Sequence, residues 1–372
     1  MKPRPRLLFV VHSAKPAGAQ YVALRQVGAL REAFELFISI PDGPLKDEFA
    51  AHGTLVPPVR SLPIWGEPRW RWALMIARVL PNSLRLARVI RRRRIEAIVT
   101  NSVVLAAPVL AARLTRRPVL VHAQEAPKTA AARRIYRFHT AMADVIVAPS
   151  SWIEETVRGA GRATVVRIPN GVSIPAERPP VPRFESRLRL CVIGTIDAHK
   201  RQDVAVEALA RLRRRGHDAV LELVGPEHDE RFAGRVRSLV DRHGLRDRVT
   251  FTGETMGIDD VLLRSDVLLL PAGEVTPLVL MQALAHQRGV VAADMGSVAD
   301  IVVHGRTGLL VAPGSAAEMA DAVETLAGAP DEARRMAVAG RRHVENLFDE
   351  STLHHRLAGT IDRHIALSAA SR

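Results

Sequence analysis

The chain has 372 residues, a formal net charge of +14 and a single cysteine. This length exceeds one ordinary hydrophobic core and suits two α/β domains, and an apolar content of 47% excludes a disordered chain. The lone Cys191 excludes an intramolecular disulfide framework and favours a reducing, cytoplasmic compartment, while the positive charge favours an anionic partner.

The first apolar run, Leu7–Val11, ends at His12. It is shorter than the roughly 7–15 apolar residues of a signal peptide, so it predicts a β-strand. Short apolar runs alternate with longer amphipathic ones along the whole chain. This alternation predicts an α/β fold with two doubly wound, Rossmann-like parallel sheets. The other predicted strands are Phe34–Ile40, Ala97–Thr100, Val119–His122, Val145–Ala148, Val165–Ile168, Leu188–Ile193, Val220–Val224, Val249–Thr252, Val267–Leu270, Val290–Ala292 and Gly308–Val311.

A proline-rich segment separates the two halves. Residues Pro175–Pro182 contain four prolines in eight positions, which excludes both a helix and a central strand. We therefore predict domains at 1–172 and 188–350, joined by a linker at 173–187. The end of the chain, 351–372, is predicted to be a helix that packs back on the first domain.

Two positions in the first domain are candidates for ligand contact. Gly18 lies in the turn after the first strand, where backbone can approach an anion at a helix N-terminus, although this can also be an ordinary βα turn. His122 ends a predicted strand, and polar residues at the carboxyl ends of parallel strands point into the ligand-binding crevice. A lone histidine is more often structural, so this assignment needs support from other residues.

The second domain offers two cations after its first strand. Lys200 and Arg201 lie in a loop that precedes a helix, where they could bind a diphosphate. Exposed cations are common in this arginine-rich chain, so a solvated pair is the alternative.

A later loop carries a carboxylate. Glu274 follows the apolar run Val267–Leu270, and a helix is predicted to begin at Thr276–Pro277. This arrangement places Glu274 beside a helix N-terminus at the carboxyl end of a strand.

Several common cofactor and metal motifs are absent from the sequence. It has no G-x-G-x-x-G fingerprint, Walker A loop or H-E-x-x-H motif, and its histidines do not show zinc-ligand spacing. No metal and no cofactor are therefore expected.

A basic and apolar region precedes the third strand. Between Arg60 and Arg94 there are ten arginines and one acidic residue, Glu67, and the region includes Trp70 and Trp72. Tryptophans with arginines suit the headgroup layer of an anionic membrane, whereas the alternative is a pair of surface helices packed on the sheet. Nucleic acid is not expected as a partner, because no reader motif or stacking platform is visible.

The order of several segments resembles the family 4 glycosyltransferases of GT-B fold, and the resemblance covers nearly the whole chain. It rests on residues Gly18–Gln20, Ala148–Ser151, Ile168–Val172, Gly194–Lys200, Glu274–Ala285 and Gly305–Val311. It implies a first domain that binds the acceptor and a second domain that binds a nucleotide-sugar donor, with their sheets facing a central cleft.

The resemblance also implies residue roles. Lys200 matches the family lysine on the donor diphosphate, Glu274 the first glutamate of the E-x7-E motif, and His122 the histidine near the reaction centre. These three are the predicted catalytic residues. Gly18, Arg201, Thr276 and Gln282 are the predicted donor contacts. The family transfers sugar with retention of configuration and without a metal.

Three positions depart from the family pattern. Thr195 stands where the family usually has arginine, Pro277 replaces a common glycine, and Gln282 replaces the second glutamate. The amide oxygen of Gln282 can still accept a hydrogen bond from a hydroxyl, but without the charge of a glutamate. The expected loss of nucleotide affinity relative to glutamate is about 1 kcal/mol. The loss of a cation at Thr195 is the larger change, unless Arg201 or Lys15 replaces it.

The main hypothesis is a cytoplasmic glycosyltransferase that moves sugar to a hydroxyl of a glycolipid, polysaccharide or metabolite, peripheral on the inner membrane face. The alternative is a GT-B-like binding or scaffold protein that has lost transfer activity.

Overall fold

In the computed structural model, the described residues are 3–59, 69–125, 130–159, 161–184, 187–255, 257–273 and 275–370, with only the backbone described for 69–76, 130 and 131. Glu274 and the side chains of Trp70 and Trp72 lie outside the described residues. The chain forms two compact units, Met1–Asn170 with Ser351–Arg372, and Gly171–Glu350.

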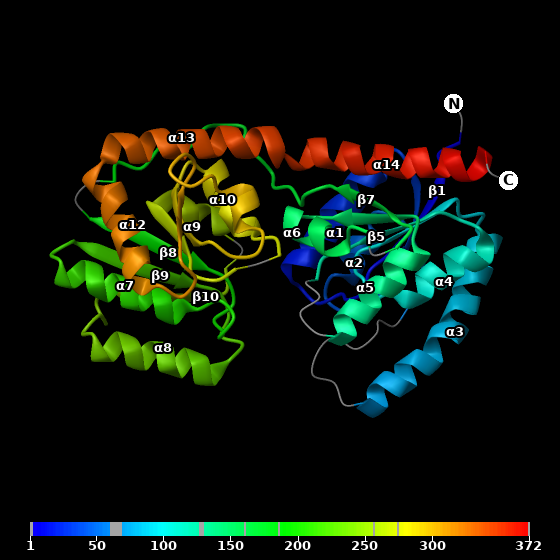
Figure 1. The fold of residues 1–372 in the computed structure, drawn as a ribbon, viewed down its shortest axis with the longest axis horizontal. Helices are drawn as coiled ribbons and strands as arrows, with labels where there is room; N and C mark the ends of the chain where they lie inside the picture. Colours follow the sequence, from blue (N-terminus) through cyan, green and yellow to red (C-terminus); the bar gives the residue numbers. More distant parts are fainter. Residues whose placement is uncertain are drawn as a thin grey trace. The chain divides into compact units, whose positions relative to one another are not determined.

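The first unit is built on a seven-stranded parallel sheet, ordered β3-β2-β1-β4-β5-β6-β7 in the described part (Figure 1). β3 has only three residues and was not among the predicted strands. The strands are β1 (Arg6–Val10), β2 (Glu35–Ser39), β3 (Thr54–Val56), β4 (Ala97–Thr100), β5 (Val119–His122), β6 (Val145–Ala148) and β7 (Thr164–Arg167). Its helices are α1 (Gly18–Leu30), α2 (Lys46–Ala50), α3 (Arg69–Arg92), α4 (Ala106–Thr115), α5 (Ala130–Met142), α6 (Ser151–Val157) and α14 (Glu350–Ala370).

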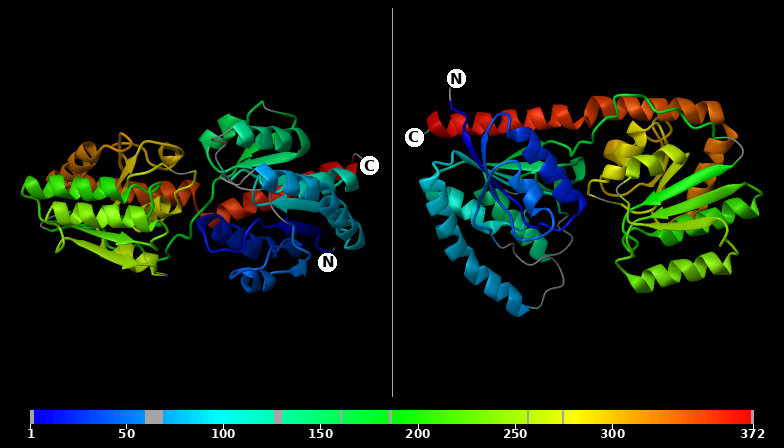
Figure 2. Two further views of the ribbon diagram at one scale, coloured as in Figure 1. Left: turned by 90° about the horizontal axis from the view of Figure 1, so that it is seen from below. Right: turned by 180° about the vertical axis from the view of Figure 1, so that it is seen from behind.

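In its described part, the second unit has a six-stranded parallel sheet, ordered β10-β9-β8-β11-β12-β13. The green strands of this sheet are seen in the right-hand view of Figure 2. The strands are β8 (Leu188–Ile193), β9 (Ala219–Val224), β10 (Val249–Gly253), β11 (Val267–Leu270), β12 (Gly289–Ala293) and β13 (Leu309–Val311). Its helices are α7 (Gln202–Arg214), α8 (Glu230–Arg242), α9 (Ile258–Arg264), α10 (Leu278–Ala285), α11 (Val298–Ile301), α12 (Ala316–Gly328) and α13 (Pro330–Leu347). The predicted pair of Rossmann-like sheets is confirmed.

Apolar strands with helices on both faces explain this architecture. The central strands β4, β5, β6, β11 and β12 are buried at every residue. Such strands need cover on both faces, and parallel pairing needs crossover connections that supply it.

The last helix, α14, packs on the core of the first unit. Leu353, Leu357 and Ile361 are at most 3% exposed and share one apolar cluster with residues of β1 and β2. Arg356 adds a hydrogen bond of 3.1 Å to the carbonyl of Arg167 at the end of β7. The chain therefore returns to the first unit after completing the second.

The proline-rich segment is bound along the second unit. Arg341 of α13 is 3% exposed and donates hydrogen bonds to the carbonyls of Pro175 (2.7 Å) and Ala285 (2.8 Å). Arg288 similarly donates to the carbonyl of Pro180, and Phe184 is buried in the second core. Because prolines leave carbonyls without a backbone partner, buried arginines supply the missing donors.

The segment Asn170-Gly171-Val172 also has a structural role. Val172 N–H donates to the carbonyl of Phe348 at 2.9 Å, and Glu350 N–H donates back to Val172 at 3.2 Å. A side chain at Gly171 would lie 2.5 Å from the Cα of Glu350, so only glycine fits. This pairing fastens the start of the second unit to its end.

Candidate functional site

The second sheet reverses its strand order between β8 and β11. Open α/β sheets bind ligands at such a point, outside the carboxyl ends of the strands. The loops after β8 and β11 carry the predicted residues Lys200 and Glu274, so strand topology puts both loops at this edge.

The loop after β8 brings Lys200 against Gly194. Gly194 has a φ of +148°, and a Cβ at this position would lie 3.4 Å from Cε of Lys200 and 3.7 Å from Nζ. Glycine therefore leaves room for the lysine amine to lie over the end of β8.

Asp197 organises the same loop. Its carboxylate accepts the backbone N–H groups of His199 (2.8 Å) and Lys200 (3.0 Å) and the hydroxyl of Thr195 (2.8 Å). Thr195, which stands at the position of the family arginine, thus helps to fix the loop. Lys200 is the cation that this turn positions.

Arg201 lies at the N-cap of α7 with a φ of 56°, and its guanidinium contacts the carboxylate of Asp203 at 3.1 Å. The two predicted cations therefore have different neighbours. The side chain of Lys200 lies beside Gly194, and that of Arg201 contacts an acid on its own helix.

The loop after β11 is held by its neighbour after β12. The hydroxyl of Ser297 donates to the carbonyl of Val275 at 2.6 Å. Thr276 Oγ1 is buried and has no hydrogen-bond partner among the described residues. Glu274 itself lies outside the described residues.

Helix α10 begins later than predicted. Its first residue is Leu278, with Pro277 at the N-cap, so the expected start at Thr276 with Pro277 in the first helical position is corrected. The backbone of Leu278 bonds to Thr276 and places a turn before the helix. Gln282 lies half-buried on α10, one turn further along.

In the first sheet the order reverses between β1 and β4, and hydrogen bonds join the two strand ends. His12 donates its backbone N–H to Oδ1 of Asn101 at 3.0 Å, and its Nδ1 lies 3.0 Å from the same oxygen. Nε2 of His12 lies 3.1 Å from Gln20 Nε2. Because Asn101 accepts and Gln20 donates, His12 is the neutral Nδ1–H tautomer, in agreement with the burial that lowers its pKa.

Gly18 is the exposed first residue of α1 beside this network. The N-cap of the helix, Ala17, provides no side-chain cap. No described side chain therefore caps the first N–H groups of α1, and the anion contact expected at this turn stays a prediction.

His122 ends β5 and is 2% exposed. Burial lowers its pKa to about 4, so the imidazole is neutral at neutral pH. Its Nε2 has no hydrogen-bond partner among the described residues. Nε2 of His139 and of His343 is unpaired in the described part as well, so this observation is compatible with a ligand hydroxyl as the missing partner but does not by itself single out His122.

Glu125 is a neighbouring residue that was not among the predicted site residues. Its carboxylate accepts the hydroxyl of Ser102 and the N–H of Val103 at 3.4 Å, both from the loop after β4. Burial raises its pKa to about 7, against the opposing effect of these hydrogen bonds. The spacing His-x-x-Glu after a strand was the only sequence signal for this residue.

Two further findings bear on membranes and metals. Within the described ranges, no three His, Cys, Asp or Glu side chains are grouped as they would be around a metal ion. No helix in the described part of the chain is long and apolar enough to cross a membrane.

Two Rossmann-like sheets with polar residues at their switch points define the GT-B class. Sequence comparison gives the family: residues 17–171 match the glycosyl transferase 4-like domain, and residues 187–328 match the glycosyl transferases group 1 domain. The chain therefore belongs to the family 4-type glycosyltransferases, as the resemblance indicated.

Individual relatives cover parts of the chain. It is 34% identical over 157 residues to alpha-D-kanosaminyltransferase of Streptomyces kanamyceticus, which is 41% of this chain and 40% of the relative. It is 31% identical over 237 residues to GDP-mannose-dependent alpha-(1-6)-phosphatidylinositol monomannoside mannosyltransferase of Mycobacterium tuberculosis, which is 58% of this chain and 60% of the relative. The matches thus span about half the length of these relatives.

Solved structures share the fold over nearly the whole chain. HepE of Anabaena in complex with UDP has a TM-score of 0.81 at 20% identity, covering 96% of this chain and all of that one. HepE has also been solved in complex with UDP-glucose, with a TM-score of 0.78.

Proposed function

We propose that the protein transfers a sugar from a nucleotide-sugar donor to a hydroxyl acceptor. The observation that carries the proposal is the position of Lys200 over Gly194, at the switch point of the second sheet, in a chain that belongs to the glycosyltransferases. Lys200 would neutralise the diphosphate as it leaves, which is where negative charge develops in the transition state.

The supporting residues divide between the two units. Glu274, Thr276 and Gln282 belong to the donor side, because they lie on or after the loop that follows β11. His122 belongs to the acceptor side, where its neutral ring could hydrogen-bond a sugar hydroxyl. We further propose retention of configuration and metal-independent transfer, with Lys200 and helix N-termini providing the positive charge.

The experiment is incubation with α-linked UDP-, GDP- and ADP-sugars. We expect release of nucleoside diphosphate from at least one donor, with the α-anomer of the sugar appearing first in proton NMR. Initial release of the β-anomer would contradict retention. Absence of both sugar release and a donor-dependent thermal shift, for every donor, would favour the alternative of a binding protein without transfer activity.

We also propose that α3 contacts an anionic membrane. Among the described side chains of this helix, Leu80 and Leu84 are 59% and 44% exposed, and Arg78, Arg85 and Arg88 are exposed around them. The helix contains no acidic residue. Exposed leucines among arginines suit a surface with apolar tails below anionic headgroups.

Vesicle sedimentation tests this contact. Binding to phosphatidylglycerol vesicles should exceed binding to phosphatidylcholine vesicles, weaken with salt, and fall in a Leu80→Ser, Leu84→Ser variant. Trp70→Ala with Trp72→Ala should weaken it further. Equal binding by all variants would refute α3 as the contact.

A further inference from the structure

The second unit contains a groove that the proposed donor site does not use. It encloses about 950 Å³ and lies between the turn before β13 and helix α13; we call it the α13 groove. Its walls include Val181, Val303, Arg306, Arg335, Val338 and Arg342.

Strand direction separates this groove from the donor edge. Val303 and Arg306 precede β13, and Val181 precedes β8, so these residues lie towards the amino ends of the parallel strands. Lys200 follows β8 and lies at the opposite, carboxyl edge. The α13 groove is therefore independent of the proposed donor site.

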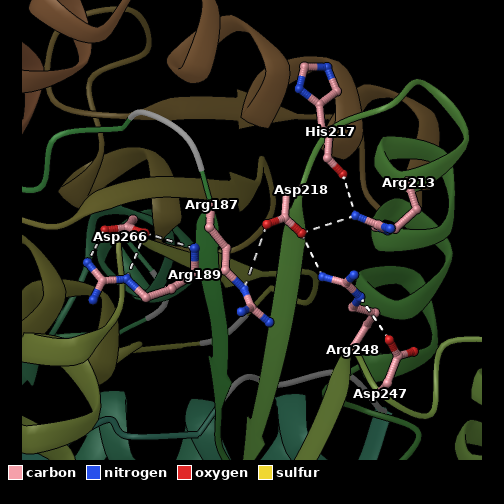
Figure 3. Close-up of polar contacts among 8 residues, drawn as sticks. All are labelled: Arg187, Arg189, Arg213, His217, Asp218, Asp247, Arg248 and Asp266. Atoms are coloured by element: carbon pink, nitrogen blue, oxygen red, sulfur yellow. Dashed lines mark hydrogen bonds and ion pairs between the residues drawn. The ribbon is translucent and has the colours of Figure 1, made fainter.

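Arginines elsewhere at the amino ends of these strands each contact an acid. Asp218 lies within reach of three guanidinium groups, those of Arg187 (4.0 Å), Arg213 (3.2 Å) and Arg248 (2.6 Å), as Figure 3 shows. Asp266 likewise pairs with Arg189 at 2.7 Å.

The α13 groove differs from that network. Its acid, Asp331, pairs with Arg334. The guanidinium groups of Arg306, Arg335 and Arg342 have no ion pair or hydrogen-bonding partner within the described residues. Three cations thus line one cavity without a balancing acid.

The remaining titratable side chain of the groove adds no charge. The pKa of His343 is lowered from its usual value, mainly by burial and to a smaller extent by the charge of Arg306. This ring is therefore neutral at neutral pH. The net positive charge of the groove therefore comes from the three unpaired arginines.

Cations and apolar side chains alternate along α13. Arg335 and Arg342 are separated by two helical turns, roughly 10 Å along the axis, with Val338 between them on the same face. Val303, on the facing turn, is 39% exposed. The volume is at the upper end of the roughly 300–1,000 Å³ that small-molecule sites enclose, so a single small anion would not fill it.

We propose that the α13 groove binds a strand of acidic polysaccharide. Arginine forks pair bidentately with carboxylate or sulfate groups, and the apolar faces of sugar rings would lie on the valines between them. The groove lining has no Phe, Tyr or Trp on which nucleic-acid bases could stack. A concave site with cations on two walls also suits a strand better than a flat membrane.

The test uses alginate oligomers, which carry a carboxylate on every ring, and neutral dextran oligomers of equal length, with binding measured by calorimetry on the full chain. A triple variant, Arg306→Ser, Arg335→Ser and Arg342→Ser, removes the three groove cations. The matched control, Arg214→Ser, Arg231→Ser and Arg242→Ser, removes the same charge from exposed positions on α7 and α8. All six side chains are exposed, and thermal unfolding checks that both variants remain folded.

We expect the groove variant to bind alginate roughly tenfold more weakly and the control to lose less than about threefold, with no binding of dextran. Equal losses in both variants would mean that net charge alone attracts the polymer and would overturn the proposal. Displacement of alginate by an equal concentration of inorganic phosphate, of single-stranded DNA or of phosphatidylglycerol vesicles would overturn it in favour of that ligand.

Discussion

Glu125 and His122 lie three residues apart and have opposite effects on the pH dependence of stability. The pKa of Glu125 is raised from 4.5 to about 7, so the folded state holds its proton and loses stability as pH rises through this window. The pKa of His122 is lowered from 6.5 to about 4, so stability is instead lost as pH falls through that window. The two effects oppose each other where the windows overlap.

Replacement of Glu125 should therefore expose the effect of His122. The free energy of unfolding of Glu125→Gln, relative to that of the wild type, should increase by up to about 3 kcal/mol as pH rises from 4.5 to about 7. Above this pH the difference should stay constant. Urea unfolding across this pH range measures the difference. A constant difference between the two proteins would mean that Glu125 has an ordinary pKa.

Gln282 offers a gain-of-affinity prediction at the donor side. Gln282→Glu replaces a neutral acceptor for a ribose hydroxyl by a charged one. This change should strengthen nucleotide binding by about 1 kcal/mol, or roughly fivefold in affinity. The control Ser238→Glu adds the same charge at an exposed position of α8. Calorimetry with the preferred nucleoside diphosphate measures both, and weaker binding by Gln282→Glu than by the control would contradict the assignment.

A family pattern was enough to predict roles for Lys200 and His122 from sequence, and those roles stay predictions. Glu125 had no such pattern, because its raised pKa depends on burial in the folded chain, where its hydrogen-bond partners Ser102 and Val103 lie more than twenty residues away. Similarly, the pairing of Arg201 with Asp203 depends on the left-handed backbone at the start of α7, which spacing alone does not reveal.

At the scale of elements, α13 and the proline-rich segment depend on one buried side chain. Arg341 donates to the carbonyls of Pro175 and Ala285 and to the carboxylate of Glu345 at 2.7 Å. Its removal leaves buried carbonyls without donors, and each unsatisfied group costs about 1–3 kcal/mol.

Arg341→Met should therefore destabilise the protein by about 3 kcal/mol, because methionine retains the apolar stem but donates no hydrogen bond. The neighbouring Arg342→Met, at an exposed position, should change the free energy of unfolding by less than about 0.5 kcal/mol. Urea unfolding compares the two. Equal stability would show that the proline-rich segment does not depend on this guanidinium.

Most strands were predictable because buried parallel strands are apolar along their whole length, as in Val145–Ala148 and Val267–Leu270. β3 was not, because only three residues pair and two are exposed. The start of α10 was misplaced because proline is common at the first helical position, whereas here it occupies the N-cap.

For the whole molecule, length and alternation were enough to predict two Rossmann-like units. They could not show that the proline-rich segment is bound to the second unit, because the donors come from Arg288 and Arg341, far along the chain. The α13 groove was also invisible in sequence, since the late turn and α13 line it together with a residue of that segment.

The central claim is that Lys200, at the switch point of the second sheet, binds the donor diphosphate without a metal. Calorimetry of UDP, GDP and ADP binding in the presence of EDTA tests it most directly. We expect at least one nucleotide to bind the wild type. Its affinity for Lys200→Ala should be lower by roughly tenfold or more, and its affinity for Arg201→Ala should be nearly unchanged. Equal binding by Lys200→Ala and the wild type, or binding that EDTA abolishes, would contradict the claim.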